Sequence, residues 1–283
     1  MPLKRDRVSE GIYVFTSGMY AEVTATAIFT EEGVVLVDTL PFPQETRQMR
    51  EFIAQRHGTV THVIITHFHA DHVYGTYQFP DADIIAHYRS RGVMERFAEE
   101  ALAQAKLQTP QLAEVEIRLP NLLFNETMTL RMGGKTIELN YSPGHSRDSI
   151  TAYVYEDRLM IASDTVMPVP YIVGGDLDDL VMSLGAIKPK NIENLVQGHG
   201  DILLRGEIEE TLDANIHYLK TIDRLVREYI ARGVPRGGVQ EITIEQCGLS
   251  RIPLGGLSLR LHQANLLALY DTYRSEMRAR HVA

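Results

Sequence analysis

The sequence THFHADH spans residues 66–72 and follows directly on the apolar run Val-Ile-Ile at 63–65. A β-strand sends alternate side chains to one face, so His67 and His69 can converge on one point where such a strand ends. Asp71 and His72 come one tight turn later and can face a second point nearby. Neutral imidazole and carboxylate together suit zinc, and also iron or manganese. The stretch therefore predicts a metal site, against the alternatives of a solvated polar loop or a helix face that carries His69 and His72.

Further polar residues stand where other apolar runs end. They follow the runs VVLV, ELNYSPG, LMIAS and ENLVQG, and they are Asp38, His145, Asp164 and His199. If these runs are neighbouring strands, their ends form one edge at which loops build a site on a rigid scaffold. Taken alone, Asp164 or His145 is equally well explained as a turn or capping residue. Together with residues 66–72, the four residues favour one shared site at that edge.

Length and composition indicate a globular protein of one or two domains, with 283 residues, 44% hydrophobic and 23% charged. The formal net charge of -9 argues against a general nucleic-acid binder. Cys247 is the single cysteine, which excludes an internal disulfide and fits a buried small apolar residue. No run has the length of a signal peptide core or a membrane span, so we expect a cytoplasmic protein with no membrane or nucleic-acid partner.

Apolar and polar alternation, together with short apolar runs, predicts a series of strands. They are 11–30 as a hairpin, 34–37 covered on both faces, 61–66, 84–86, the hairpin 127–131 and 135–141, the pair 149–155 and 158–162, and 194–197 as the last strand. Helical periodicity predicts helices at 43–57, 73–79, 88–107, from a cap at Asp176 to about Ile187, from Glu207 onward, and after Gly255-Gly256. The irregular segment 109–125 is either a loop that covers the active site or a plain connection.

The ordered set of polar residues resembles the metallo-β-lactamase-fold superfamily, whose pattern is HxHxDH followed by a His, an Asp and a last His at wide spacings. The match runs from about Gly11 to Gly200, with SPGHS, SDT and QGHG as its later blocks. The resemblance implies an α/β fold, a four-layer αβ/βα sandwich of two mixed β-sheets flanked by helices. We expect a metal-binding core over residues 1–205 and a C-terminal helical extension, residues 206–283, packed on it.

The same resemblance implies a set of metal ligands. His67, His69 and His145 would hold one ion, Asp71, His72 and His199 would hold the other, and Asp164 would bridge them. An aspartate at the position of Asp164 makes the chain similar to glyoxalase II, lactonases and binuclear phosphodiesterases more than to true β-lactamases. Two zinc ions are the expected cofactor, with iron or manganese as alternatives. Asp38 would support the ligands from behind.

These expectations lead to a binuclear zinc hydrolase. A metal-bridging hydroxide would cleave an ester, thioester, lactone or related bond in a small molecule. Asp71 would act both as a ligand and as a proton shuttle, because a carboxylate beside the hydroxide can accept a proton and return it to the leaving group. Tyr171 follows the Asp164 strand end in a Pro-flanked segment, and we expect it to face the substrate as a hydrogen-bond donor.

Other activities fit the same ligand pattern. A mononuclear iron oxygenase, similar to persulfide dioxygenase, keeps these ligands while using a single iron. β-Lactamase-like and phosphodiesterase hydrolysis are further alternatives. A nuclease is disfavoured by the acidic composition, and a non-enzymatic member of the fold is disfavoured because this chain matches every ligand position.

The substrate is not indicated by these motifs, because fold and metals are shared by many reactions. Several apolar residues near the ligands in sequence either line the mouth of the site or belong to the core: Phe68, Tyr74, Met167, Pro168, Pro170 and Tyr171. Arg147 is either a contact for an anionic group or a solvated side chain. The C-terminal helices pack on the sandwich or form a homodimer contact.

Overall fold

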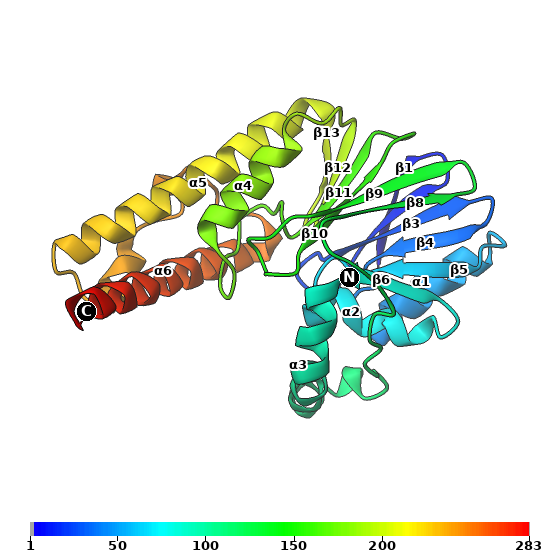
Figure 1. Cartoon of the computed structure of the whole chain (residues 1–283), viewed down its shortest axis with the longest axis horizontal. Coiled ribbons are helices and arrows are strands. Elements are labelled where there is room, and N and C mark those ends of the chain that lie inside the picture. Colours follow the sequence, from blue (N-terminus) through cyan, green and yellow to red (C-terminus); the bar gives the residue numbers. More distant parts are fainter. Residues whose placement is uncertain (1–2, 283) are drawn as a thin grey trace.

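The computed structural model describes residues 3–282, which fold into two β-sheets stacked face to face with helices on both outer sides (Figure 1). The first sheet is mixed, and its strands lie side by side in chain order. Strands β1 to β4 pair antiparallel, whereas β4 to β7 pair parallel. They are β1 (Lys4–Ser9), β2 (Ile12–Thr16), β3 (Thr24–Thr30), β4 (Gly33–Val37), β5 (Val60–Ile64), β6 (Asp83–His87) and β7 (Leu122–Phe124).

The second sheet is also mixed and has the order β13-β12-β11-β10-β9-β8. Its pairs are antiparallel except for β11 and β12, which run parallel. Its strands are β8 (Thr127–Met132), β9 (Lys135–Tyr141), β10 (Ile150–Val154), β11 (Leu159–Ser163), β12 (Asn194–Gln197) and β13 (Ile202–Leu204).

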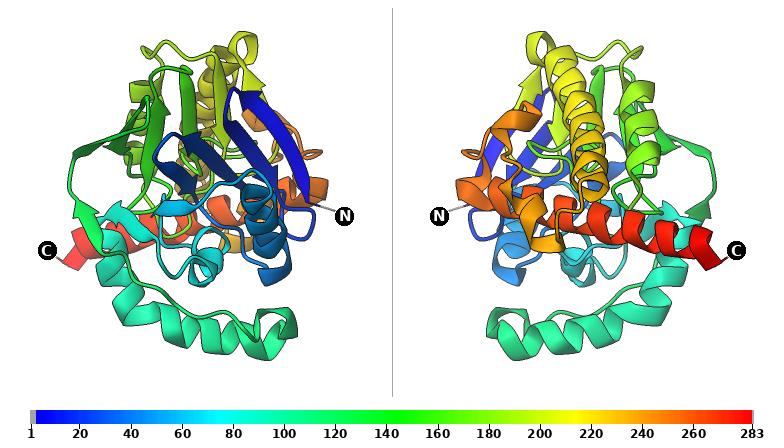
Figure 2. Two further views of the ribbon diagram at one scale, coloured as in Figure 1. Left: turned by 90° about the vertical axis from the view of Figure 1, so that its right-hand side faces the viewer. Right: turned by 90° about the vertical axis from the view of Figure 1, so that its left-hand side faces the viewer.

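Helices cover the outer faces of both sheets, and α3 and α5 lie on opposite sides of the sandwich (Figures 1 and 2). The α-helices are α1 (Pro43–Ala54), α2 (Ala70–Val73), α3 (Tyr88–Gln108), α4 (Leu177–Ile187), α5 (Arg205–Ala231) and α6 (Leu257–Val282). Short 3₁₀ turns connect them at η1 (Tyr74–Gln78), η2 (Pro110–Leu112), η3 (Arg236–Glu241), η4 (Glu245–Cys247) and η5 (Leu254–Gly256).

Three separate apolar cores hold the four layers together. In β4, Val35 and Val37 face the core between the two sheets, while Val34 and Leu36 face the core under α1 and α3. This alternation confirms that residues 34–37 form a strand covered on both faces, because successive strand residues point to opposite sides. A third core joins the second sheet to α4, α5 and α6, and it includes the buried Cys247. The predicted four-layer αβ/βα sandwich is therefore confirmed.

Strand ends from both sheets meet at one edge. The parallel strands β4 and β5 end at Val37 and Ile64, and the parallel strands β11 and β12 end at Ser163 and Gln197. A backbone hydrogen bond, in which the Thr24 amide donates to the Gly198 carbonyl at 2.9 Å, joins the two sheets there. Loops that leave these ends are thus held by strands on both sides, which gives a rigid base for a site.

Some elements differ from the predictions. The strand β1 was not expected because its sequence KRDRVS is charged; it forms the exposed edge of the first sheet, where charged side chains are common. Strand β7 lies inside the segment predicted as irregular, and β13 follows β12, so 194–197 is not the last strand. The helix predicted at 43–57 ends at Ala54, and the helix predicted at 73–79 is a 3₁₀ turn preceded by α2.

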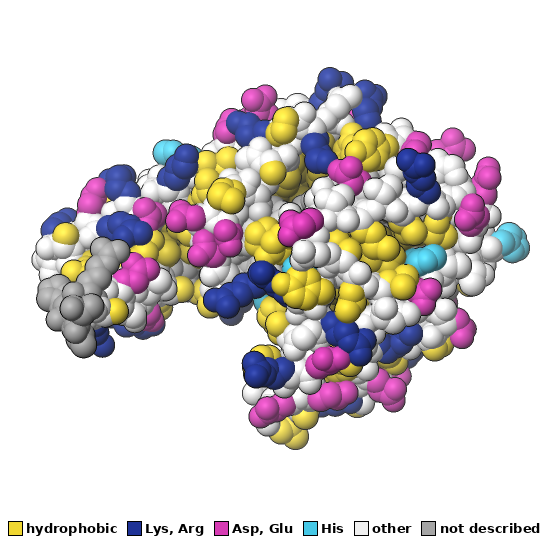
Figure 3. All heavy atoms as spheres, in the orientation of Figure 1, with side chains coloured by type: hydrophobic (Ala, Val, Ile, Leu, Met, Phe, Trp, Pro, Cys, Tyr) yellow, Lys and Arg dark blue, Asp and Glu magenta, His cyan; other side chains and the backbone are white. Residues whose placement is uncertain are grey.

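The long C-terminal helices α5 and α6 run beside one another and extend from the second sheet (Figure 1). They share one apolar core with that sheet, although a domain boundary at residues 205 and 206 stays a prediction. None of the described helices is both long and apolar enough to cross a membrane. On the face in Figure 3, basic and acidic side chains are interspersed, with no single broad basic area.

Candidate metal centre

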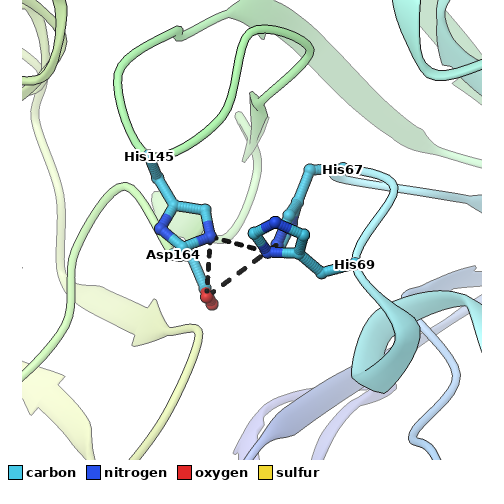
Figure 4. A group of neighbouring side chains, drawn as sticks. All are labelled: His67, His69, His145 and Asp164. Atoms are coloured by element: carbon cyan, nitrogen blue, oxygen red, sulfur yellow. Dashed lines mark hydrogen bonds and ion pairs between the residues drawn. The ribbon is translucent and has the colours of Figure 1, made fainter. Parts of the chain in front are cut away.

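The seven predicted ligands lie together at the rim where the strand ends meet. Their potential ligand atoms form two groups, each with all atoms within 4.8 Å of one another. The first group contains His67, His69, His145 and Asp164 (Figure 4). The first two lie after β5, the third lies in the β9–β10 connection, and Asp164 directly follows β11. The second group comes from α2 and from the turn after β12, and contains Asp71, His72 and His199. Five of the seven lie in turns or loops that the sheets hold in place, and the other two, Asp71 and His72, lie in α2.

Asp164 lies between the two groups. Its Oδ2 atom is 3.3 Å from His145 Nε2 and 3.8 Å from His67 Nε2, which belong to the first group. Its Oδ1 atom is 3.3 Å from His72 Nε2, which belongs to the second group. The chain leaves room for this carboxylate at Gly198, where a Cβ atom would come within 1.8 Å of Asp164 Oδ1. A side chain at position 198 would therefore displace Asp164.

The outward-facing ring nitrogens of four histidines have fixed partners. His145 Nδ1 is 2.9 Å from the Tyr171 carbonyl, and His199 Nδ1 is 2.8 Å from the Ala21 carbonyl. A carbonyl only accepts, so both Nδ1 atoms carry the proton in these contacts. His72 Nδ1 lies 2.8 Å from Asp38 Oδ2, and His67 Nδ1 lies 3.1 Å from the Thr66 hydroxyl. Such outer contacts orient metal-binding imidazoles and set their tautomers, leaving Nε2 free to face inward.

The inward-facing nitrogens crowd one another in a way that hydrogen bonds cannot satisfy. His69 Nδ1 lies 2.9 Å from both His67 Nε2 and His145 Nε2. A single proton on His69 Nδ1 can be directed at only one of these two atoms, so at least one contact leaves lone pairs opposed. In addition, His72 Nε2 and Asp164 Oδ1 are buried without a hydrogen-bond partner among the described residues. A cation between these atoms would satisfy all of them, so the residues present fit a metal ion.

The protonation states also suit a cation. Burial lowers the pKa of His145 to about 4 and holds the pKa of His67 well below its ordinary value, so both rings are neutral near pH 7. Burial opposes protonation of His72, but the surrounding carboxylates, led by Asp164, outweigh it and raise the His72 pKa well above normal. Burial likewise favours neutral Asp164, yet the nearby histidines, led by His199, hold its pKa well below normal. The first group thus offers neutral imidazoles at His67 and His145. The ionised Asp164 attracts positive charge, which without a metal ion is a proton on His72.

Asp38 supports the ligands from beneath, as the sequence suggested. Besides His72, it accepts hydrogen bonds from the Thr66 amide at 2.9 Å and from the Thr66 hydroxyl at 2.7 Å. The Thr66 hydroxyl also contacts the Ser163 hydroxyl at 2.8 Å, next to Asp164. Asp38 therefore ties the ends of β4, β5 and β11 into one buried network that positions ligands from both groups.

Asp148 is a supporting residue that the sequence did not single out. It is buried and accepts from the Phe68 amide at 2.9 Å, from the Ser90 hydroxyl at 2.6 Å and from the Ser146 hydroxyl at 2.6 Å. These bonds connect the loop that carries His67 and His69 with the loop that carries His145. The sequence held no signal for this role beyond a polar residue three positions after His145, because its partners are distant in the chain.

A cavity of about 330 Å³ opens over the two groups. Of the apolar residues predicted at its mouth, Met167 and Tyr171 line it. Phe68 packs against the core under α1 and α3, and Tyr74 is buried in that core. Pro168 lines a different hollow, and the buried Pro170 accepts a hydrogen bond from Asn265 through its carbonyl. Tyr171 is half-buried, and its ring centroid is 6.0 Å from that of His145.

For two further parts of the chain the sequence left alternatives open, and neither part lines the cavity. Arg147 is exposed and does not line the cavity, so it is a solvated side chain. The segment 109–125 does not line it either; it carries η2 and β7, and it connects α3 to the second sheet. The described residues that do complete the walls include Tyr20 and Ala21, which precede β3, and Leu257 and Leu261 of α6. No motif marks these positions in the sequence, so they were missed.

Comparisons with known proteins agree with this geometry. A beta-lactamase-like protein 2 homolog from Caenorhabditis elegans is 22% identical over 187 residues, covering 64% of this chain and 57% of that protein. A thioesterase from Emericella nidulans is 24% identical over 174 residues, covering 60% of this chain and 43% of that protein. The chain therefore matches between two fifths and three fifths of the length of these two curated relatives.

Solved structures share the fold at low sequence identity. A sec-alkyl sulfatase superposes with a TM-score of 0.74 at 16% identity, covering 96% of this chain and 50% of that chain. A metallo-beta-lactamase from Pontibacter korlensis superposes with a TM-score of 0.62 at 18% identity, covering 75% of this chain and 97% of that one. The sequence model described as the metallo-beta-lactamase superfamily matches residues 21–216, which is more than half of the chain. This chain belongs to the metallo-beta-lactamase superfamily.

Proposed function

We propose that this protein is a binuclear metal-dependent hydrolase, with zinc as the preferred metal, that cleaves an ester, thioester, lactone or related bond in a small molecule. The observation that carries the proposal is the position of Asp164 between two groups of inward-facing ligand atoms. One carboxylate that faces two such groups could contribute an oxygen ligand to an ion in each of them. The imidazole-rich donor set favours zinc over magnesium or calcium, which prefer oxygen ligands.

The residues that would hold the two ions are those of the two groups described above. When bound, the ions would supply Lewis-acid chemistry and a nucleophilic water at neutral pH. Asp71 lies at the open side, 3.4 Å from His199 Nε2 through its Oδ2 atom, and it lines the cavity. Its carboxylate is placed to accept a proton from the attacking water and to return it to the leaving group. Asp71 would thus act as ligand and as proton carrier.

Tyr171 is the second residue proposed to act on the substrate. Its backbone carbonyl fixes the His145 ring, while its side chain lines the cavity over the first group. Burial raises the pKa of the Tyr171 phenol above its ordinary value, so the hydroxyl keeps its proton at neutral pH. A protonated phenol at this wall can donate a hydrogen bond to an oxygen of the substrate on which charge develops.

The names of several relatives support a thioester as the bond that is cleaved. Several matched proteins carry thioesterase in their names, among them one from Emericella nidulans and one from Aspergillus terreus. The narrow cavity over the ligand groups would admit the bond to be cleaved, and the remainder of the substrate must extend outward. We propose a small molecule rather than a nucleic acid as substrate, consistent with the net charge of -9.

The test compares zinc-loaded with iron-loaded protein. Both forms are assayed on a panel of lactones, thioesters, β-lactams and phosphodiesters, while an oxygen electrode follows a persulfide substrate in parallel. We expect the zinc form to cleave a member of the panel, with esters or thioesters preferred, because hydrolysis needs only a Lewis acid. Oxygen uptake by the iron form, together with no cleavage by the zinc form, would instead identify a mononuclear iron oxygenase.

A further inference from the structure

A second hollow adjoins the cavity over the ligands. Its volume is about 560 Å³, and it shares Tyr20, Ala21, Tyr171, Leu257 and Leu261 with the smaller cavity. We call the two together the substrate cleft. Because five lining residues are common to both hollows, the substrate cleft extends from the ligand groups along α6.

One wall of the substrate cleft is a single face of α6. Leu257, Arg260, Leu261 and Ala264 line the second hollow, and they occupy positions i, i+3, i+4 and i+7 of the helix. Side chains with that spacing lie on the same side of a helix. Three of the four are apolar, so this wall suits an apolar part of a ligand, and Arg260 is the polar exception.

A second wall is a loop, residues 17–22, which buried polar contacts hold in one conformation. Glu45, which is buried, accepts from the Ser17 hydroxyl at 2.5 Å and from the Gly18 amide at 2.8 Å. Ala21 and Glu22 both adopt left-handed backbone angles, with φ of 46° and 53°. Such conformations cost free energy in residues other than glycine and persist where the surroundings impose them, often at functional sites.

This loop faces both the centre and the solvent. The Ala21 carbonyl accepts from His199, which fixes the loop to the second ligand group. Met19 and Tyr20 nevertheless keep 39% and 47% of their surface exposed while lining the hollow. Large apolar side chains that stay exposed beside the ligand groups are suited to contact a bound molecule rather than to fill a core.

Arg260 gives the substrate cleft its charge. Among the described residues that line the second hollow, it is the one charged side chain. The side chain is exposed, and its guanidinium has no ion-pair or hydrogen-bond partner among the described residues. Guanidinium groups bind carboxylates and phosphates through paired hydrogen bonds, and a partner-free guanidinium at the end of an apolar cleft can do so without first breaking another contact.

From these contacts we infer that the substrate is an amphiphilic ester or thioester, with an apolar body that lies between residues 17–22 and α6 and a carboxylate that pairs with Arg260. This inference rests on the proposed hydrolase function and adds the chemical class of its substrate. Arg260 is then a specificity-determining residue at the far end of the substrate cleft from the bond that is cleaved. The α5–α6 segment thereby has a role in the reaction, because α6 supplies both the apolar face and the charge.

The test uses matched substrates that differ only in charge. Monothioesters of α,ω-dicarboxylic acids, from succinyl to sebacoyl, are compared with the same thioesters in which the free carboxylate is a neutral amide. A third series carries the carboxylate on the thiol side, which reports the direction in which the substrate lies. The zinc-loaded wild type is assayed beside Arg260→Gln, Arg260→Lys and the control Arg50→Gln, an exposed arginine of α1 that lines neither hollow.

We expect Arg260→Gln to raise KM about tenfold for the best carboxylated thioester and to change KM for its neutral amide by less than about twofold. Arg260→Lys should recover part of the loss, because it keeps the charge but not the paired geometry. Arg50→Gln should behave as wild type. Equal effects on charged and neutral substrates, or no effect on either, would overturn the inference while leaving the hydrolase proposal intact.

A binding measurement separates the two proposals if no thioester is cleaved. Thioether analogues have no bond to hydrolyse, so calorimetric titration with the carboxylated thioether and its amide measures recognition alone. If Arg260→Gln binds the carboxylated analogue more weakly but binds the amide as wild type does, the proposed recognition by Arg260 is supported. The absence of cleavage then counts against the proposed hydrolysis alone. Binding that is insensitive to charge in every variant would remove Arg260 from the recognition of the substrate.

Discussion

The ligand groups and the substrate cleft lie side by side at one rim, but they are built in opposite ways. The ligand groups are buried, and nearly every outer polar atom around them has a fixed partner, such as Asp38 for His72. The substrate cleft has exposed apolar side chains and the Arg260 guanidinium, which has no ion-pair or hydrogen-bond partner in the described part of the chain. Reaction chemistry needs groups held in one geometry, whereas recognition needs surface that remains open until a ligand arrives. The two regions should therefore respond differently to substitution.

Removing the shared carboxylate should have the largest effect. Asp164→Asn keeps the size of the side chain but removes the charge that faces both groups, so we expect loss of metal and a fall in kcat of more than about 100-fold. The measurement is metal content and hydrolysis of the best panel substrate, beside Asp178→Asn, an exposed control on α4. Full metal content and full activity in Asp164→Asn would remove the shared carboxylate from the account.

Replacing Asp38, which supports His72, should weaken metal binding less than replacing Asp164 does. Asp38→Asn replaces an acceptor of the His72 ring by a group that offers a donor, so the ring loses its fixed orientation. We expect zinc affinity to fall about 10- to 100-fold, as for other outer contacts of metal-bound imidazoles. Competition with a chromophoric chelator measures this affinity. An unchanged affinity would show that the network around Thr66 is structural only.

Tyr171 stands at the border of the two regions, and its phenol and its backbone have separate roles. Tyr171→Phe leaves the carbonyl that holds His145 in place and removes the hydroxyl that we propose as a donor to the substrate. We expect kcat to fall about tenfold, with metal content and melting temperature unchanged within about 2 °C. Steady-state kinetics measure the change in kcat, and thermal unfolding measures the change in melting temperature. A lowered melting temperature with unaltered kinetics would assign the ring to packing.

The loop at residues 17–22 should give the smallest effect, confined to recognition. Glu45→Gln weakens the bonds that hold Ser17 and Gly18, so Met19 and Tyr20 lose part of their fixed placement. We expect KM to rise about two- to fivefold while kcat and metal content stay near wild type. Glu51→Gln, exposed on the same helix, is the matched control. Loss of metal in Glu45→Gln alone would mean that the loop supports His199 more than the substrate.

The contrast between the ligand groups and the substrate cleft also explains which residues the sequence could predict. The sequence pointed to the seven candidate ligands because the motif at residues 67–72 is rare by chance and because alternate strand residues share a face, as for His67 and His69. Asp38 was found in the same way, directly after an apolar run. The four-layer architecture was implied by the resemblance to the superfamily. The sequence pattern itself indicated single elements, such as the strand at residues 34–37 and the helical period of α5.

The substrate cleft could not be predicted in this way. Tyr20 and Leu257 are 237 positions apart in the chain, and nothing local in either residue signals that they share a wall. Arg260 and Arg147 are both arginines near apolar residues in sequence, and only the fold shows that Arg260 lines the hollow whereas Arg147 is in solvent. The short strands β7 and β13 were missed because three residues carry too little alternation to indicate a strand.

The most direct test is the number of metal ions that the protein binds. Elemental analysis of protein purified without added metal, followed by titration of the apoprotein with zinc, measures that number and the affinity of each site. The account predicts about two divalent ions per chain, because the seven side chains form two groups joined by Asp164. Saturation at one ion or fewer per chain would contradict it.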